Sequence, residues 1–142
     1  YEYAGHVTTL NEGQGTIPGM KWFTALAWSR DRWSATLNHT SISSVVDLGA
    51  GGIVFASSTS LKRVPVPSYT SWDTSVSYAF KNLGLPGGKK LFSGLKLTLG
   101  VNNLADQLPP SAPQAFGGDV GVDLATYNPI GRLWYVSAGL KF

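Results

Sequence analysis

Residues 132–142 read Arg-Leu-Trp-Tyr-Val-Ser-Ala-Gly-Leu-Lys-Phe, and an apolar side chain recurs at every second position. One face of this stretch carries Trp134, Val136, Ala138, Leu140 and Phe142, and the other carries Tyr135, Ser137, Gly139 and Lys141. A period of two predicts a β-strand. Because an unpaired strand edge that finishes in an apolar side chain is an aggregation hazard, we expect a partner strand and apolar surroundings.

Composition narrows the class of protein. Of 142 residues, 13% are charged, 17 are glycine, five are tryptophan and none is cysteine. Glycine suits a strand-rich fold with tight turns, and tryptophan is enriched at membrane boundaries. The lack of cysteine excludes disulfides and thiolate metal sites. A net charge of +3 gives no reason to expect a nucleic-acid partner.

The chain has no run of the roughly 18–20 apolar residues that a spanning helix requires. Residence in a membrane would therefore depend on strands. The opening Tyr-Glu-Tyr-Ala-Gly has neither an initiator Met nor the pattern of a signal peptide. We accordingly expect a mature chain or a piece of a longer one.

Alternation also predicts four further strands. They cover residues 20–29, 32–42, 69–81 and 91–103, and residues 1–19 read as the top of another strand that runs into a loop. Tight turns at 30–31 and 82–90 and long loops at 43–67 and 104–131 connect them. The predicted fold class is all-β, an antiparallel meander of about five to six strands, in one domain that covers residues 1–142.

Two regularities favour a transmembrane β-barrel. The connections alternate between short and long, and most apolar faces carry aromatic residues at one or both rims. Bacterial outer-membrane barrels have short periplasmic turns, long outer loops and aromatic girdles. The girdle predicted here consists of Trp22, Trp28, Trp33, Trp72, Trp134 and Phe142. The expected location is the bacterial outer membrane, with its lipid as a partner.

Charge placement partly follows the same division. The predicted periplasmic side holds the cations Arg30, Arg32, Lys81, Lys89, Lys90 and Lys141. The predicted outer loops hold the carboxylates Glu12, Asp47, Asp106, Asp119 and Asp123. Asp31 and the pair Lys62-Arg63 break the rule. Solvated loops carry charge in many proteins, so solvation and contact with cationic ligands both stay open as explanations.

Three ordered segments resemble a known family. They are Val-Pro-Ser-Tyr-Thr-Ser-Trp-Asp at 66–73, Gly-Val-Asn-Asn-Leu-Ala-Asp-Gln-Leu-Pro-Pro at 100–110 and Tyr-Asn-Pro-Ile-Gly-Arg at 127–132. This succession, with a terminal Phe, is similar to the closing strands of TonB-dependent outer-membrane receptors. The resemblance covers residues 64–142 by these motifs and residues 20–44 by pattern only.

The resemblance implies that the chain is the closing part of a 22-stranded transmembrane β-barrel. Such receptors import scarce nutrients, namely iron-siderophores, cobalamin or glycans, with TonB-coupled energy. The plug domain and the earlier strands of the barrel are missing from this sequence. The implied partners are the ligand, the TonB complex through the missing plug, and the barrel-assembly machinery through the carboxy-terminal strand.

Candidate site residues follow from this placement. Gln114, Asp119, Asp123 and Tyr127 lie in the last outer loop, where contact with a ligand is expected. The motif residues Asn102, Asn103, Pro109, Pro110 and Gly131 have the chemistry of strand ends and turns, and we interpret them as structural. Arg132 is expected to pair with an acidic residue at the outer rim, and Asp73 and Lys81 point to the lumen.

The sequence suggests no chemistry of an enzyme. Only two histidines are present, no phosphate-loop spacing occurs, and no catalytic arrangement has local support. We therefore expect no enzyme activity, no cofactor and no metal.

Two alternatives to the transporter stay open. One is a small self-contained outer-membrane barrel of eight strands with an adhesive or structural role. The other is a soluble all-β binding module that buries its apolar faces against a second sheet.

Overall fold

The computed structural model describes residues 4–7, 16–48, 63–80, 83–84, 90–92, 94–113 and 121–140. Within these ranges the chain is all-β, as predicted. No helix in them has the length and the apolar character needed to cross a membrane. The residues form two compact units, and each is described by itself. Unit 1 comprises Tyr1–Phe23, Thr40–Thr70 and Gln107–Gly131, and unit 2 comprises Thr24–His39, Ser71–Asp106 and Arg132–Phe142.

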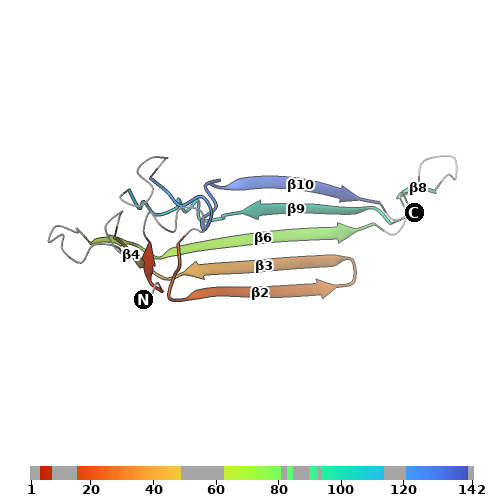
Figure 1. Cartoon of the computed structure of the whole chain (residues 1–142). Coiled ribbons are helices and arrows are strands. Elements are labelled where there is room, and N and C mark those ends of the chain that lie inside the picture. The colour runs from red at the N-terminus through yellow and green to blue at the C-terminus, as the bar shows by residue number, and fades with distance from the viewer. Residues whose placement is uncertain are drawn as a thin grey trace. The chain divides into compact units, whose positions relative to one another are not determined.

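The predicted antiparallel meander is confirmed as a five-stranded sheet with the order β10-β9-β6-β3-β2 (Figure 1). Its strands are β2 (Lys21–Arg30), β3 (Trp33–Ile42), β6 (Tyr69–Ala79), β9 (Lys96–Asn102) and β10 (Leu133–Gly139). We call the end with the β2–β3 turn the turn end and the opposite end the loop end. Strands that follow one another among these five are neighbours in the sheet, so the alternation located them correctly.

The register confirms the two faces that alternation predicted. On one face Trp134, Val101 and Thr74 pair across three strands, and two residues further Val136, Leu99 and Val76 do the same. On the other face the corresponding rows are Tyr135, Gly100 and Ser75, and Ser137, Thr98 and Ser77. We call these the apolar face and the polar face.

Several strand boundaries differ from the prediction. The tight turn consists of Asp31 and Arg32, with Asp31 at φ 55°, one position later than expected. The predicted strand 91–103 is interrupted, because Gly94 takes φ 85° and β9 starts only at Lys96. Before it, β7 (Leu83–Gly84) lies inside the predicted turn at 82–90 and pairs with β8 (Lys90–Phe92), which overlaps the start of the predicted strand 91–103. The last strand ends at Gly139, and Lys141 and Phe142 lie outside the described residues.

The prediction of a loop at 43–67 was wrong in part. β4 (Val45–Asp47) and β5 (Val64–Val66) pair there, and β1 (His6–Val7) adds to β4 in parallel, giving a second sheet in unit 1. Strands of two or three residues are too short to show a period of two. They form because Val7, Val45, Val66 and Ala112 bury one another, each at most 3% exposed.

One cross-strand pair on the polar face depends on a glycine. Gly100 is buried in β9, and a Cβ built there would overlap the ring and hydroxyl of Tyr135 on β10. The aromatic ring thus covers the backbone of its partner glycine, a device that pins the register of neighbouring strands.

Substitution Gly100→Ala is expected to turn the Tyr135 ring away from β9. Tyr135 is 37% exposed, so its ring has space to move, and the loss is that of one ring-to-backbone contact. We expect the free energy of unfolding to fall by about 1 kcal/mol, the low end for added volume in a packed site. Gly139→Ala is the matched control, because no atom lies within 4 Å of its Cβ position. Equal effects of both substitutions in denaturant titrations would contradict this account.

Candidate functional site

The apolar face is the most unusual surface in the described part of the chain. Val136 is 76% exposed, Trp134 61% and Leu99 54%. Further exposed apolar side chains on this face, each between 38% and 62% exposed, are Trp22, Leu26, Trp28, Trp33, Trp72, Val76 and Leu97. Val101 on the same face is 3% exposed. Contiguous exposed apolar surface of this kind marks contact with a partner or a membrane.

Aromatic side chains border this face at both ends. At the turn end the ring centroid of Tyr78 is 4.7 Å from that of Trp33 and 4.7 Å from that of Phe80. Toward the loop end His39 stacks on Trp72, with centroids 4.2 Å apart and planes 29° apart. Between the two groups the side chains include aliphatic residues such as Val76 and Leu99. The apolar face is therefore an aliphatic band with aromatic borders.

The predicted girdle residues fall on this face as far as they are described. Trp134 and Trp72 lie on it by register, and Trp33 by its contact with Tyr78. Trp28 lines a groove with Ala35 and Leu37, and Trp22 follows by alternation along β2. Phe142 lies outside the described residues. Contact of these side chains with lipid stays a prediction.

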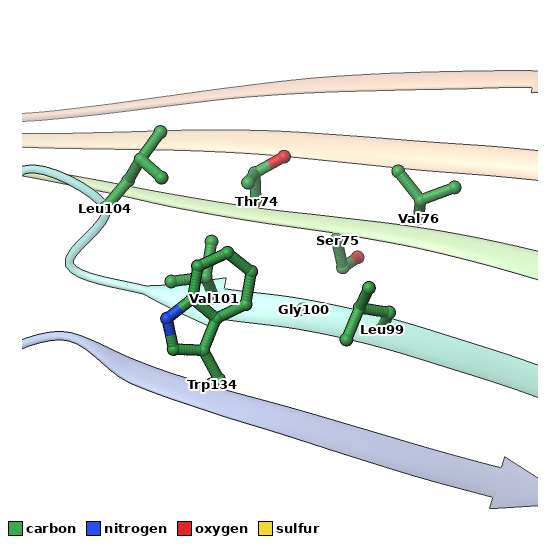
Figure 2. A pocket seen from close by; sticks show the side chains of 8 residues that line it. All are labelled: Thr74, Ser75, Val76, Leu99, Gly100, Val101, Leu104 and Trp134. Carbon is green, nitrogen blue, oxygen red and sulfur yellow. The ribbon is translucent and has the colours of Figure 1, made fainter.

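Shallow grooves run between the side chains of the apolar face. One of about 190 Å³ is lined by residues of β6, β9 and β10 together with Leu104, and Trp134 reaches toward it from β10 (Figure 2). A second groove of about 400 Å³ shares Val76 and Leu99 with it, and a third of about 230 Å³ shares Thr74. The grooves thus succeed one another across the face.

Hydroxyl groups of the polar face form hydrogen bonds between neighbouring strands. The hydroxyls of Thr36 and Ser75 lie 2.8 Å apart, and so do those of Ser77 and Thr98. These pairs bridge β3 to β6 and β6 to β9. The sheet is therefore amphipathic, with hydrogen-bonded hydroxyls on one side and most of the exposed apolar side chains on the other. Phe23 and Tyr135 are exposed aromatic residues on the polar face.

Carboxylates at the loop end of unit 2 accept hydrogen bonds from backbone N–H groups. Asp73, predicted to face the lumen and to need a partner, accepts a hydrogen bond from the N–H of Asn103 at 2.8 Å. Asp106 accepts one from the N–H of Arg132 at 2.7 Å. Arg132 thus meets an acidic residue through its backbone, and pairing of its side chain stays a prediction. Lys81 lies outside the described residues.

Asp123, one of the predicted ligand contacts, is buried in unit 1. It is 1% exposed, and its Oδ2 accepts a hydrogen bond from the N–H of Thr16 at 2.5 Å. Its Oδ1 accepts from the N–H groups of Ala125 at 2.9 Å and Thr126 at 3.1 Å. Burial acts to raise the pKa of Asp123, but the hydrogen bonds from Thr126 and Thr16 outweigh it and hold the pKa below its usual 3.8. The carboxylate therefore joins two distant segments of the chain.

Tyr127, a second predicted contact, lies in the same cluster. It is 3% exposed and packs edge-on against Tyr69, with ring centroids 5.4 Å apart. Burial raises the pKa of Tyr127, the nearby charge of Asp123 raises it further, and a polar contact with Thr16 offsets part of the rise. The structure brings Asp123 and Tyr127 together, while Gln114 and Asp119 lie outside the described residues. Contact of any of the four with a ligand stays a prediction.

Sequence reasoning overlooked Thr16 and Thr126 as members of this cluster. The spacing from Asp123 to Ala125 and Thr126 is that of an aspartate that accepts from N–H groups two and three residues later, which is a recognisable local pattern. Thr16 is 107 residues away in sequence and has no such signal. No group of three or more His, Cys, Asp or Glu residues suited to a metal ion occurs within the ranges described.

The lowered pKa of Asp123 predicts an acid limit for this cluster. A carboxylate whose pKa falls on folding contributes stability that is fully present above the unfolded pKa, here about 3.8. That contribution is lost as pH falls through the lower folded value. We expect the NMR signal of the Thr16 amide to shift with an apparent pKa below 3.8, as the proton displaces its hydrogen bond. A titration midpoint above 3.8 would contradict this.

A comparison of the chain with models of known protein families, with curated proteins and with solved structures found no match.

Proposed function

We propose that the five-stranded sheet lies in a lipid bilayer as part of a transmembrane β-barrel, with its apolar face toward the acyl chains. The observation that supports this most is the aliphatic band of Val76, Leu99 and Val136, which is 45–76% exposed and bordered by aromatic rings. In water such a surface is unfavourable by about 25 cal/mol per Å². In hydrocarbon that penalty disappears.

The dimensions of the band suit a bilayer. Trp72 and Phe80 flank Val76 at four residues on either side, and eight residues of strand extend about 27 Å. A strand tilt of about 40° reduces the height to about 20 Å, close to the ~25 Å apolar band of outer-membrane barrels. Tryptophan and tyrosine rings at the two borders would then lie at the two interfaces, where their polar groups reach water.

A soluble module would use the same sheet differently. It would bury the apolar face against a second sheet about 10 Å away, and its tryptophans would serve as core residues. Here Trp134 and Trp72 lie toward the loop end and Trp33 toward the turn end. This border position favours the membrane over a second sheet.

Within the class of outer-membrane barrels we propose a TonB-dependent transporter that imports an iron-siderophore, cobalamin or a glycan. The three segments that carry the resemblance are joined in unit 2 by hydrogen bonds. Asp73 of the first segment binds the backbone of Asn103 in the second, and Asp106 of the second binds the backbone of Arg132 in the third. The Leu104 N–H also donates to the Trp72 carbonyl at 2.7 Å. The order and the mutual contacts of the segments support one structural motif rather than three chance similarities.

In such a transporter these residues form part of the wall. The chain would contribute lipid contacts on the apolar face and a hydrogen-bonded lining on the polar face, and a separate plug would couple to the energy source. No catalytic role is proposed for any residue.

Deletion of the encoding gene tests the transporter proposal. The mutant should grow normally on rich medium and fail on one limiting source, an iron chelate, cobalamin or a glycan. Loss of the TonB protein should reproduce the failure, and the restored gene should cure it only when TonB is present. Recovery of the gene product in the aqueous fraction without detergent would overturn the proposal. Growth rescue independent of TonB would contradict the TonB-dependent transporter and would be consistent only with a β-barrel of another class.

A further inference from the structure

Cations and carboxylates are distributed unequally along the five-stranded sheet. Among its described side chains the turn end carries Arg30, Arg32 and Lys96 with one carboxylate, Asp31. The loop end carries Asp73 and Asp106 with two cations, Lys21 and Arg132. The turn end therefore has the more positive charge.

The two arginines of the turn end lie beside the aromatic border of the apolar face. Arg32 Nη1 donates to the hydroxyl of Tyr78 at 3.4 Å, and Tyr78 contacts Trp33. Arg30 shares by alternation the face of Trp28, and its side chain is 80% exposed. Lys96 differs, because in β9 it alternates with Leu97 and shares the polar face with Thr98.

Asp31 neutralises this pair only weakly. Its carboxylate is 86% exposed and 3.9 Å from the Nε of Arg30, at the outer limit of an ion pair. Exposed pairs of this kind contribute little and are screened by salt. Both guanidinium groups keep free donors for an anion.

We propose that Arg30 and Arg32 bind the phosphate of anionic phospholipid headgroups at the interface beside the turn end. This inference rests on the proposed membrane location of the sheet. Acyl chains of the same lipids would fill the grooves beside Trp33 and Val76, so one lipid molecule would contact both features. Guanidinium groups suit phosphate because their planar donors bind two oxygens at once.

The expected size of the effect follows from the charges. One Lys or Arg near an anionic surface contributes about 1 kcal/mol, which is about fivefold in partition. Two arginines, opposed in part by Asp31, should raise partition to anionic over neutral vesicles by roughly tenfold at low salt. The remaining cations of the chain should add a smaller preference for anionic vesicles, which should not depend on where in the chain each cation lies.

The test compares binding of the full chain to vesicles of phosphatidylcholine alone and of phosphatidylcholine mixed equally with phosphatidylglycerol. The double variant Arg30→Gln and Arg32→Gln should lose most of the preference for the anionic vesicles. Two matched controls remove a cation elsewhere: Lys96→Gln at the same end on the polar face, and Arg132→Gln at the loop end, whose backbone bond to Asp106 needs no side chain. Both should keep most of the preference, and Asp31→Asn should raise it.

Each outcome decides a separate point. Equal losses in the double variant and in the controls, after correction for the number of charges removed, would overturn the headgroup site. Competition by inorganic phosphate beyond that of chloride at the same ionic strength would show that free phosphate occupies the arginines. Equal binding of the unchanged chain to both vesicles would refute this inference alone, whereas failure to bind either kind would refute the membrane location as well.

Discussion

Val136→Arg is expected to lower the free energy of unfolding in lipid vesicles by about 2–4 kcal/mol. Val136 pairs with Leu99, which pairs with Val76, and Val76 lies midway between Trp72 and Phe80. The arginine would therefore enter the middle of the apolar band, where a charge is least tolerated in a bilayer. In water the same position is 76% exposed, and the substitution should change the free energy by less than about 0.5 kcal/mol.

Ser137→Arg is the matched control for this substitution. Ser137 is the next residue of β10, is exposed, and lies on the polar face. Denaturant titrations of tryptophan fluorescence in vesicles should show a normal transition for Ser137→Arg and a shifted one for Val136→Arg. The reverse order would mean that the two faces are assigned the wrong way round.

Asp123→Asn is expected to loosen unit 1 by on the order of 2–3 kcal/mol, since hydrogen bonds to a charged acceptor contribute about 1.5–3 kcal/mol. The amide oxygen of Asn can still accept from Ala125 and Thr126. Its NH₂ group, however, would face the N–H of Thr16, so a donor would meet a donor. Among the described residues, the segments would then be held only by the Thr126 hydroxyl, which accepts from the Thr16 N–H at 2.9 Å, so their contact should weaken while the local turn persists.

Amide hydrogen exchange measures this weakening directly. Protection should fall at Thr16 and stay unchanged at backbone amides of β6 and β9. Asp31→Asn removes the same charge from an exposed turn, where φ 55° suits Asn as well as Asp, and should leave protection at Thr16 unaltered. Full protection of Thr16 in Asp123→Asn would show that the carboxylate is dispensable.

Alternation predicted the five-stranded sheet because its strands are long enough to show a period of two. Ten residues of β3 and eleven of β6 leave little ambiguity about which side chains share a face. The same rule places Val101 and Trp134 on one face, and the structure adds that they pair. Turn chemistry gave approximate boundaries, but a single backbone conformation, such as that of Gly94, moved the start of β9.

Contacts between segments that are distant in sequence could not be predicted from the sequence. The sheet of β1, β4 and β5 depends on the mutual burial of Val7, Val45 and Val66. No local sequence pattern predicts this burial. The tertiary contacts of the candidate loop residues could not be predicted from the sequence either. Asp123 was identified as a polar loop residue, but its burial and its bond to Thr16 depend on a segment 107 residues earlier.

Fluorescence quenching in vesicles tests the central claim, that the apolar face contacts acyl chains. All five tryptophans of the chain belong to this face, by register, by contact or by alternation along β2. Lipids brominated along the acyl chain should quench most of the tryptophan emission, and aqueous acrylamide should quench little of it. Strong quenching by acrylamide together with no quenching by brominated lipid would contradict the claim and place this face in water or against protein.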